Sequence, residues 1–369
     1  MRIGINLLNL AGDRYGGVEH YVKNLIWHLA QVGENVTLFL FMNRPYRDLF
    51  PDDVINIKQI LFKDKGNESK VIEAIHEFRI DVWFCPLHKS YISNIPVPSV
   101  ATIHDVLHTA YPHFVPGEKE WNNQYYDHYS SQLDAVITVS EFSKNEIIKQ
   151  VKIPEEKVYA IYQDVPIEFN QSLNKNQTQL IKKKYQLPNH YALYPASYNP
   201  HKNHLTLLKA ILLLRNKYKK HIPLVLTGYT QESNTIYLSV KHFLKEHRLE
   251  KQIHILGYVP PKDMPYIFEN SSFLIFPSLY EGFGIPLVEA MKTKTPMVCS
   301  NRGSIPEIAA DAALFFNPED PKDIALQILK VCKKKTMNEL IKRGKKRAKS
   351  FSLERSASDT IKVFQSVLH

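Results

Sequence analysis

The chain has 369 residues, of which 44% are hydrophobic and 23% are charged, and this composition indicates a globular protein long enough for two α/β domains. No run of about 18 apolar residues occurs, and the first residues become polar too soon for a signal peptide. We therefore expect a cytoplasmic protein that at most touches the inner face of the membrane. Three cysteines without a CxxC pair argue against a disulfide-stabilised secreted fold.

The formal net charge of +10 is divided unevenly along the chain. Residues 1–170 hold 16 Lys or Arg against 22 Asp or Glu, a net of −6, whereas the rest hold 31 against 15, a net of +16. Much of the excess lies in residues 330–349. Such a run is usually a solvated helix face, and a contact with nucleic acid or anionic lipid is the alternative.

The first half alternates short β-rich runs with helical patterns, which predicts a parallel α/β sheet. The predicted strands are residues 3–7, 36–41, 82–84, 99–103, 135–139 and 158–161. After the first of them, a loop ends in Gly16-Gly17 and an amphipathic helix begins. The free backbone N–H groups of such a helix start can bind an anion, although glycines also serve in plain turns.

Two polar residues, His104 and Asp105, follow the fourth predicted strand. They stand at the carboxyl edge of the sheet, where open α/β folds bind their ligands. From the residues alone, a locally hydrogen-bonded His and a turn-capping Asp are the better explanation of the pair. Further along, Ser140 is the predicted N-cap of the helix after the fifth strand.

The strand pattern lapses over residues 163–189, a polar stretch that we interpret as the interdomain linker. It then begins again, with predicted strands at 191–194, 224–227, 253–256, 273–276, 297–300 and 313–316. Two six-strand halves of similar rhythm predict two facing, doubly wound Rossmann-like domains with a ligand cleft between them.

The strand at 273–276 leads into a glycine-rich turn and a helix start that carry two carboxylates, Glu281 and Glu289. Gly282 and Gly284 allow the backbone to approach a ligand closely, and Pro286 suits the first helical position. The helix would then direct free N–H groups at an anionic ligand, while the carboxylates could bind hydroxyl groups such as those of a ribose. For isolated glutamates, a helix cap and a solvated face are the plain alternative.

This segment resembles the donor-site motif of family 4 retaining glycosyltransferases, which have the two-domain GT-B fold. The matching pattern is Pro-Ser-x-x-Glu-Gly-Phe-Gly-Ile-Pro-x-x-Glu-Ala-Met over residues 277–291. The resemblance implies that Glu281 and the adjacent backbone contact the donor sugar and that Glu289 binds the nucleotide ribose. The backbone positions concerned are Gly282, Phe283, Gly284, Ile285 and Leu287.

The resemblance extends over nearly the whole chain. It implies that Lys202, in a Lys-Asn pair, neutralises the donor diphosphate. The family commonly has an arginine just before this lysine or a few residues upstream, but this chain has His201, Ser197 and Ala196 there. His104 would face the donor sugar, as in bacterial mannosyltransferases of surface-polysaccharide synthesis. The other implied contacts are Gly16 and Gly17 with the donor phosphate, Tyr258 and Val259 with the base, and Arg302 with a phosphate.

The implied domains are 1–172 with 351–369, on the acceptor side, and 173–350, which binds the nucleotide sugar. The implied activity is a retaining, metal-independent hexosyl transfer, with His104, Lys202 and Glu281 as the catalytic set. The donor would be a nucleotide-diphosphate sugar, GDP-mannose first, with UDP-glucose or UDP-N-acetylglucosamine next; no other cofactor and no metal site are expected. The acceptor would be a hydroxyl of a glycan or lipid-linked oligosaccharide, with possible peripheral membrane contact and no nucleic acid.

Two other classes of protein remain compatible with the residues. A nucleotide-sugar epimerase shares the architecture and needs no acceptor, but the paired glutamates with Lys202-Asn203 argue against it. A non-catalytic protein that binds nucleotide sugars or nucleic acid would explain the missing arginine and the basic segment at 330–349.

Overall fold

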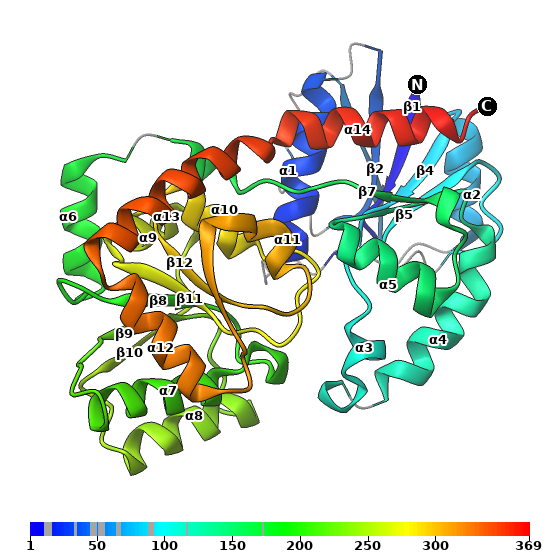
Figure 1. Cartoon of the computed structure of the whole chain (residues 1–369). Helices are drawn as coiled ribbons and strands as arrows, with labels where there is room; N and C mark the ends of the chain where they lie inside the picture. Colours follow the sequence, from blue (N-terminus) through cyan, green and yellow to red (C-terminus); the bar gives the residue numbers. More distant parts are fainter. Residues whose placement is uncertain are drawn as a thin grey trace. The chain divides into compact units, whose positions relative to one another are not determined.

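The computed structural model describes residues 1–10, 17–32, 35–44, 50, 56–63, 68–87, 92–115, 117–171 and 173–369. These residues form two compact units (Figure 1). Unit 1 consists of Met1–Asp164 and Ser352–His369, and unit 2 consists of Val165–Phe351. Unit 2 is therefore inserted between two segments of unit 1.

Unit 1 is built on a seven-stranded parallel sheet with the order β3-β2-β1-β4-β5-β6-β7. Its strands are β1 (Arg2–Asn6), β2 (Thr37–Asn43), β3 (Ile57–Phe62), β4 (Val82–Cys85), β5 (Ser99–Thr102), β6 (Ala135–Thr138) and β7 (Val158–Ala160). Its helices are α1 (Gly17–Val32), α2 (Glu68–Glu77), α3 (Leu107–Ala110), α4 (Glu118–Tyr129), α5 (Glu141–Val151) and α14 (Leu353–Ser366). Ser140 caps α5 as predicted, since its hydroxyl accepts the Ser143 N–H at 3.0 Å.

The prediction of six strands in the first half was wrong, because β3 is a seventh. It pairs with β2 alone, at the edge of the sheet, and only Ile57 in it is fully buried. Lys58 and Gln59 interrupt its apolar pattern. An edge strand needs no continuous apolar run, since one of its sides has no neighbouring strand to cover it.

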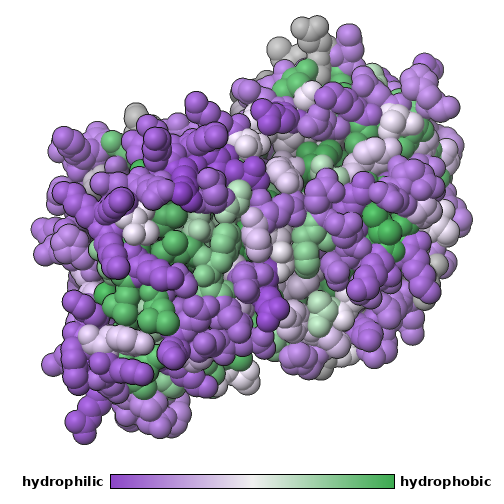
Figure 2. All heavy atoms as spheres, in the orientation of Figure 1, coloured by the Kyte–Doolittle hydropathy of each residue, from purple (hydrophilic) through white to green (hydrophobic). Residues whose placement is uncertain are grey.

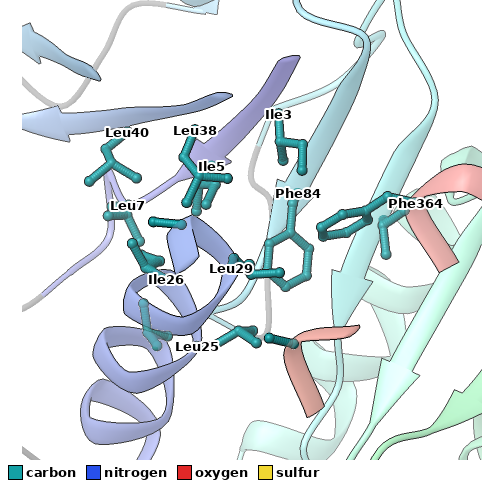
Figure 3. Close-up of a cluster of buried hydrophobic side chains, with 14 of the residues drawn as sticks. Ile3, Ile5, Leu7, Leu25, Ile26, Leu29, Leu38, Leu40, Phe84 and Phe364 are labelled. Carbon is teal, nitrogen blue, oxygen red and sulfur yellow. The ribbon is translucent and has the colours of Figure 1, made fainter. Parts of the chain in front are cut away.

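The core of unit 1 brings together residues from both ends of the chain (Figure 3). Buried side chains of β1 and β2, such as Ile3 and Leu38, pack against α1. On α1, Leu25 and Leu29 lie one helical turn apart and face this core together. Phe364 of α14 completes this core, with its ring centroid 5.0 Å from that of Phe84 in β4. The last helix is therefore part of the unit that contains the first strand.

Unit 2 has a six-stranded parallel sheet with the order β10-β9-β8-β11-β12-β13. Its strands are β8 (Ala192–Pro195), β9 (Leu224–Thr227), β10 (Ile253–Gly257), β11 (Phe273–Phe276), β12 (Met297–Ser300) and β13 (Ala313–Phe316). Its helices are α6 (Lys175–Lys184), α7 (His204–Asn216), α8 (Thr235–Glu246), α9 (Met264–Asn270), α10 (Ile285–Lys292), α11 (Ile305–Ala309), α12 (Pro321–Val331) and α13 (Lys334–Arg347). All six strands predicted for this half are confirmed, because short apolar runs of a doubly covered sheet are the clearest strand signal.

The polar stretch interpreted as a linker contains helix α6, which packs on unit 2. At its C-terminal end, Lys184 and Tyr185 both donate to the buried Asp263 carboxylate, at 2.6 and 2.7 Å. Ile181 is the one fully buried residue of this helix. A helix that buries so little is polar almost all round, and its composition therefore resembles that of a linker.

Hydrophilic side chains cover most of the face shown in Figure 2, with hydrophobic residues in small groups. None of the helices in the described ranges is both long and apolar enough to span a membrane.

Candidate active site

Two loops meet at the point where the strand order of unit 2 reverses. β8 and β11 are neighbours in the sheet, although β9 and β10 separate them along the chain. In open α/β sheets, ligands bind at the carboxyl ends of the strands at such a switch point. The loop after β8 carries Lys202 and the loop after β11 carries Glu281, and the Leu279 N–H donates to the His201 carbonyl at 2.8 Å to join the two loops.

Lys202 and Glu281 form an ion pair, with 2.7 Å between the Lys202 Nζ and the Glu281 Oε1. Their side chains are only 18% and 11% exposed. Charges withdrawn from water in this way interact strongly, and each would be costly to leave without its partner. The two predicted catalytic residues of unit 2 are thus brought together by the fold.

Asn203 ties the Lys202 turn to two other strand ends. Its backbone has a φ of 60°, in the left-handed region that Asn tolerates better than most residues. Its side-chain Nδ2 donates to the carbonyl of Pro277, after β11, at 3.1 Å and to that of Pro318, after β13, at 2.8 Å. Both protons of one amide are therefore used to hold three loops together.

Tyr194 supports the same turn from inside the sheet. Its hydroxyl donates to the Lys202 carbonyl at 2.6 Å and lies 3.4 Å from the Ser278 hydroxyl. Burial raises the pKa of Tyr194 well above its ordinary value, so the hydroxyl remains a neutral donor.

The glycine-rich turn after β11 holds the Glu281 backbone in place. Gly284 has a φ of 92° and is the N-cap of α10, which makes Pro286 the second helical residue rather than the predicted first. Gly303, with a φ of 61°, lies so close that a Cβ there would be 3.0 Å from the Glu281 backbone nitrogen and oxygen. The Ser304 hydroxyl lies 3.0 Å from the carbonyl oxygens of Glu281 and Phe283.

Glu289, on α10, has a partly buried side chain. In the part of the chain that the structure describes, no donor forms a hydrogen bond or ion pair with its side chain. Burial raises the pKa of Glu289 to about 8. The group is therefore available to bind hydroxyl groups of a ligand that would replace the lost water.

The other predicted donor contacts of unit 2 lie in different settings. Arg302 pairs with the exposed Glu319 carboxylate at 2.9 Å and is itself 46% exposed. After β10, Tyr258 is half exposed whereas Val259 is buried. Leu287 is fully buried, so only its backbone could reach a ligand.

Unit 1 contains the other predicted site residues that the structure describes, Gly17 and His104. Gly17 begins α1, and Gly16 lies outside the described residues. His104 lies beyond β5, with its Nε2 3.3 Å from the Pro86 carbonyl and its Nδ1 3.4 Å from the Gln163 Nε2. Since an amide N–H can only donate, Nδ1 is the acceptor, and the neutral ring carries its proton on Nε2.

Asp105 has the local role that the residues alone left open. Its carboxylate accepts the Leu107 N–H at 3.0 Å, just before α3. The ring of His104 meets the Tyr21 ring edge-on, with 4.8 Å between centroids.

Sequence reasoning missed the residues that position the Lys202–Glu281 pair. Tyr194 looks like an ordinary core residue of a buried strand. Gly303 and Ser304 lie in a segment in which only Arg302 was predicted to have a role. Only Asn203 carried a signal, since an Asn directly after the key lysine favours a left-handed turn.

Within the described ranges, no group of three or more His, Cys, Asp or Glu side chains is arranged to hold a metal ion.

Two family models match the chain. Residues 15–169 match glycosyltransferase family 4, and residues 176–347 match glycosyl transferases group 1. The chain is also 30% identical to O-antigen chain mannosyltransferase B of Escherichia coli over 373 aligned positions, which cover 95% of this chain and 96% of that one. It is 27% identical to the serotype-specific mannosyltransferase WbdA of Escherichia coli over 63% of this chain and 29% of that longer protein.

Solved structures share the fold. A glycosyltransferase from Rickettsia africae has a TM-score of 0.78 at 16% identity, covering 100% of this chain and 98% of that one. HepE from Anabaena, in complex with UDP and glucose, has a TM-score of 0.78 at 17% identity, covering 99% and 100%. At these identities the likeness concerns the fold alone.

Proposed function

Because the chain belongs to glycosyltransferase family 4 and has the GT-B fold, we propose that it transfers mannose from GDP-mannose to a hydroxyl group of a growing surface glycan. The observation that carries the choice of sugar is the 30% identity to an O-antigen chain mannosyltransferase over 95% of this chain. The same relative supports a glycan or lipid-linked acceptor. Epimerase and nucleic-acid-binding functions have no comparable support.

Lys202 would stabilise the departing nucleoside diphosphate. The chemical difficulty is the negative charge that gathers on this leaving group as the sugar carbon becomes oxocarbenium-like, so a preorganised cation is the most useful group. Lys202 is mostly shielded from water, which strengthens its interaction with a phosphate. The start of α10 would add backbone N–H groups and the positive end of its dipole.

Glu281 would exchange partners when the donor binds. In the structure its carboxylate pairs with Lys202 at 2.7 Å. With Lys202 turned toward a diphosphate, Glu281 would accept hydrogen bonds from the hydroxyls of the sugar. The backbone of Gly282 to Ile285 and of Leu287 would contact the donor beside it. Lys202 would then face the anionic diphosphate, and neutral sugar hydroxyls would solvate the Glu281 carboxylate in place of the ammonium group.

The remaining donor contacts follow the same division of roles. Glu289 would bind the ribose hydroxyls, Tyr258 and Val259 would border the base, and Gly17 and Arg302 would approach phosphate oxygens. His104, held as a neutral ring by Pro86 and Gln163, would face the sugar.

We further propose that transfer retains the anomeric configuration and requires neither metal ion nor cofactor. Lys202 and the α10 N-terminus would supply the positive charge that a metal otherwise provides. The departing phosphate oxygen would take the proton of the acceptor hydroxyl as the new glycosidic bond forms on the same face of the sugar.

A thermal-shift panel tests the donor. Melting temperatures would be measured without metal for GDP-mannose, GDP, UDP-glucose, UDP-N-acetylglucosamine and UDP, with wild type and Lys202→Ala. Selective stabilisation by GDP-mannose and GDP, reduced in the variant, is the expected result, because a ligand of the folded state raises the melting temperature. Selective stabilisation by a UDP compound would overturn the choice of donor.

A transfer assay with chelator present tests the chemistry. Undiminished mannose transfer and an α-linked product from the α-configured donor are expected. A product of inverted configuration, or loss of activity that added Mg²⁺ restores, would contradict this mechanism.

A further inference from the structure

Helix α13 carries a row of lysines on the side that faces away from its own unit. Leu340 and Gly344 are buried, and Gly344 lies against Met291 of α10. At about 100° per residue, Lys335, Lys342 and Lys346 fall on the opposite side of the helix, flanked by Lys334 and Lys345. Lys349 extends the row in the turn that follows. We call these six residues the lysine face.

The lysine face has no counter-charge among the residues that the structure describes. All six side chains are exposed, and none forms a hydrogen bond or ion pair in the ranges that the structure describes. Glu339, the acidic residue of this helix, pairs with Arg343. Lysines spaced three and four apart repel one another, so the arrangement weakens the helix unless an external anion relieves it.

The arginines of the same helix are used differently. Arg343 donates to the Asp311 carbonyl, and Arg347 donates to the carbonyls of Glu307 and Ile308. The planar guanidinium groups thus fasten α13 to its own unit, whereas the compact ammonium groups point to solvent. The arginines of α13 therefore hold the helix on unit 2, while its lysines leave positive charge on the surface.

We propose that the lysine face binds a membrane surface that contains anionic lipids. A cluster of four to eight basic residues on a helix is typical of attraction to anionic headgroups. Nucleic-acid surfaces commonly add arginine for base or phosphate recognition and aromatic side chains for stacking. The lysine face has neither, and residues 334–349 contribute no large exposed hydrophobic side chain, so docking would be electrostatic and reversible.

Vesicle co-sedimentation of the full chain tests the proposal. The probes are vesicles of phosphatidylglycerol with phosphatidylethanolamine and vesicles of phosphatidylcholine alone. The lysine-face variant combines Lys335→Gln, Lys342→Gln, Lys345→Gln and Lys346→Gln. The matched control combines Lys217→Gln, Lys220→Gln, Lys245→Gln and Lys251→Gln, which removes the same charge from other exposed lysines of unit 2.

The expected result is wild-type binding to the anionic vesicles alone, with release at about 0.5 M salt. The lysine-face variant should lose affinity by roughly 10³-fold, and the control by less than about 10-fold. Equal losses in both variants, binding to phosphatidylcholine, or tighter binding to a short oligonucleotide would each overturn the proposal. Melting temperatures with and without nucleotide confirm that both variants fold and keep the donor site, so this test is independent of the proposed donor.

Discussion

The Lys202–Glu281 pair combines two energetic roles that mutations can separate. Removing either partner leaves the other charge poorly solvated, at a cost on the order of 1–3 kcal/mol. We predict that Lys202→Met lowers both the free energy of unfolding and kcat, the latter by roughly 10²–10³-fold. The double variant Lys202→Met/Glu281→Gln should regain stability but not activity. Denaturant unfolding and donor kinetics check this, and recovery of both properties together would refute a catalytic role for the lysine.

Asn203 should act on the reaction through its neighbours. Asn203→Gly keeps the left-handed backbone but removes both hydrogen bonds, whereas Asn203→Asp points a carboxylate oxygen at two carbonyls. We predict lower kcat for both variants and the larger loss of stability, about 2 kcal/mol, for Asp. Steady-state kinetics with unfolding curves would measure it. Full kcat in the Gly variant would mean that the amide does not position Lys202.

Glu289 should make stability depend on pH. Burial raises its pKa from 4.5 to about 8, so the folded state holds a proton that the unfolded chain releases in that window. The free energy of unfolding of the wild type, relative to Glu289→Gln, should be greatest below pH 4.5 and fall as the pH rises towards 8, by at most about 1.4 kcal/mol per pH unit. Denaturant titrations at several pH values would detect it. Equal slopes for both proteins would show that Glu289 ionises normally.

At the residue scale, the sequence predicts the residues that would contact the donor better than it predicts the residues that hold them in position. Lys202 and Glu281 could be recognised because each stands in a local motif. The clamp of Asn203 could not, since its carbonyl partners lie 74 and 115 residues away. Nothing in Pro277 or Pro318 distinguishes a carbonyl that accepts this hydrogen bond from one that binds water.

Among the elements of unit 2, the turn at Gly303 and helix α13 differ in how they tolerate an added methyl group. Gly303→Ala would strain a φ of 61° and press a Cβ against the Glu281 backbone at 3.0 Å. We predict that it costs at least about 1 kcal/mol and displaces Glu281, with reduced kcat. Kinetics and melting temperature measure both effects.

Gly344→Ala is the matched control for that change. A Cβ at Gly344, inside α13, would lie 3.8 Å from the nearest atom, in ordinary contact with Met291. Replacing a helical glycine should stabilise the protein by about 0.5–1 kcal/mol and leave kcat unchanged. A similar loss in both variants would mean that the effect at Gly303 is not specific to the Glu281 turn.

Elements differ in how far their sequence predicts them. The buried strands of both sheets stand out because solvent reaches neither face. The edge strand β3 and the polar helix α6 do not, because each is held by one side only: β3 by pairing with β2, and α6 through contacts such as Lys184 with Asp263. Their formation depends on tertiary partners that a local pattern does not contain.

At the scale of the whole molecule, unit 1 depends on a helix that follows unit 2 in the chain. Phe364 is fully buried in unit 1, whereas Leu368, just beyond the same helix, is 41% exposed. We predict that Phe364→Ala destabilises unit 1 by about 3–5 kcal/mol and that Leu368→Ala changes little. Tryptophan fluorescence is a selective probe, since Trp27, Trp83 and Trp121 all belong to unit 1. Equal midpoints for the two variants would contradict the role of α14 in this core.

The insertion of unit 2 within unit 1 also has a consequence during synthesis on the ribosome. All strands of unit 1 leave the exit tunnel before unit 2, but α14 leaves only after it. At about 5–20 residues per second, unit 2 takes roughly 10–40 s to translate. Through that time the Phe84 side of the first sheet has no α14 to cover it. The usual order, in which the N-terminal domain of a nascent chain folds first, should therefore be reversed, and the nascent first sheet is the segment that a chaperone would have to protect.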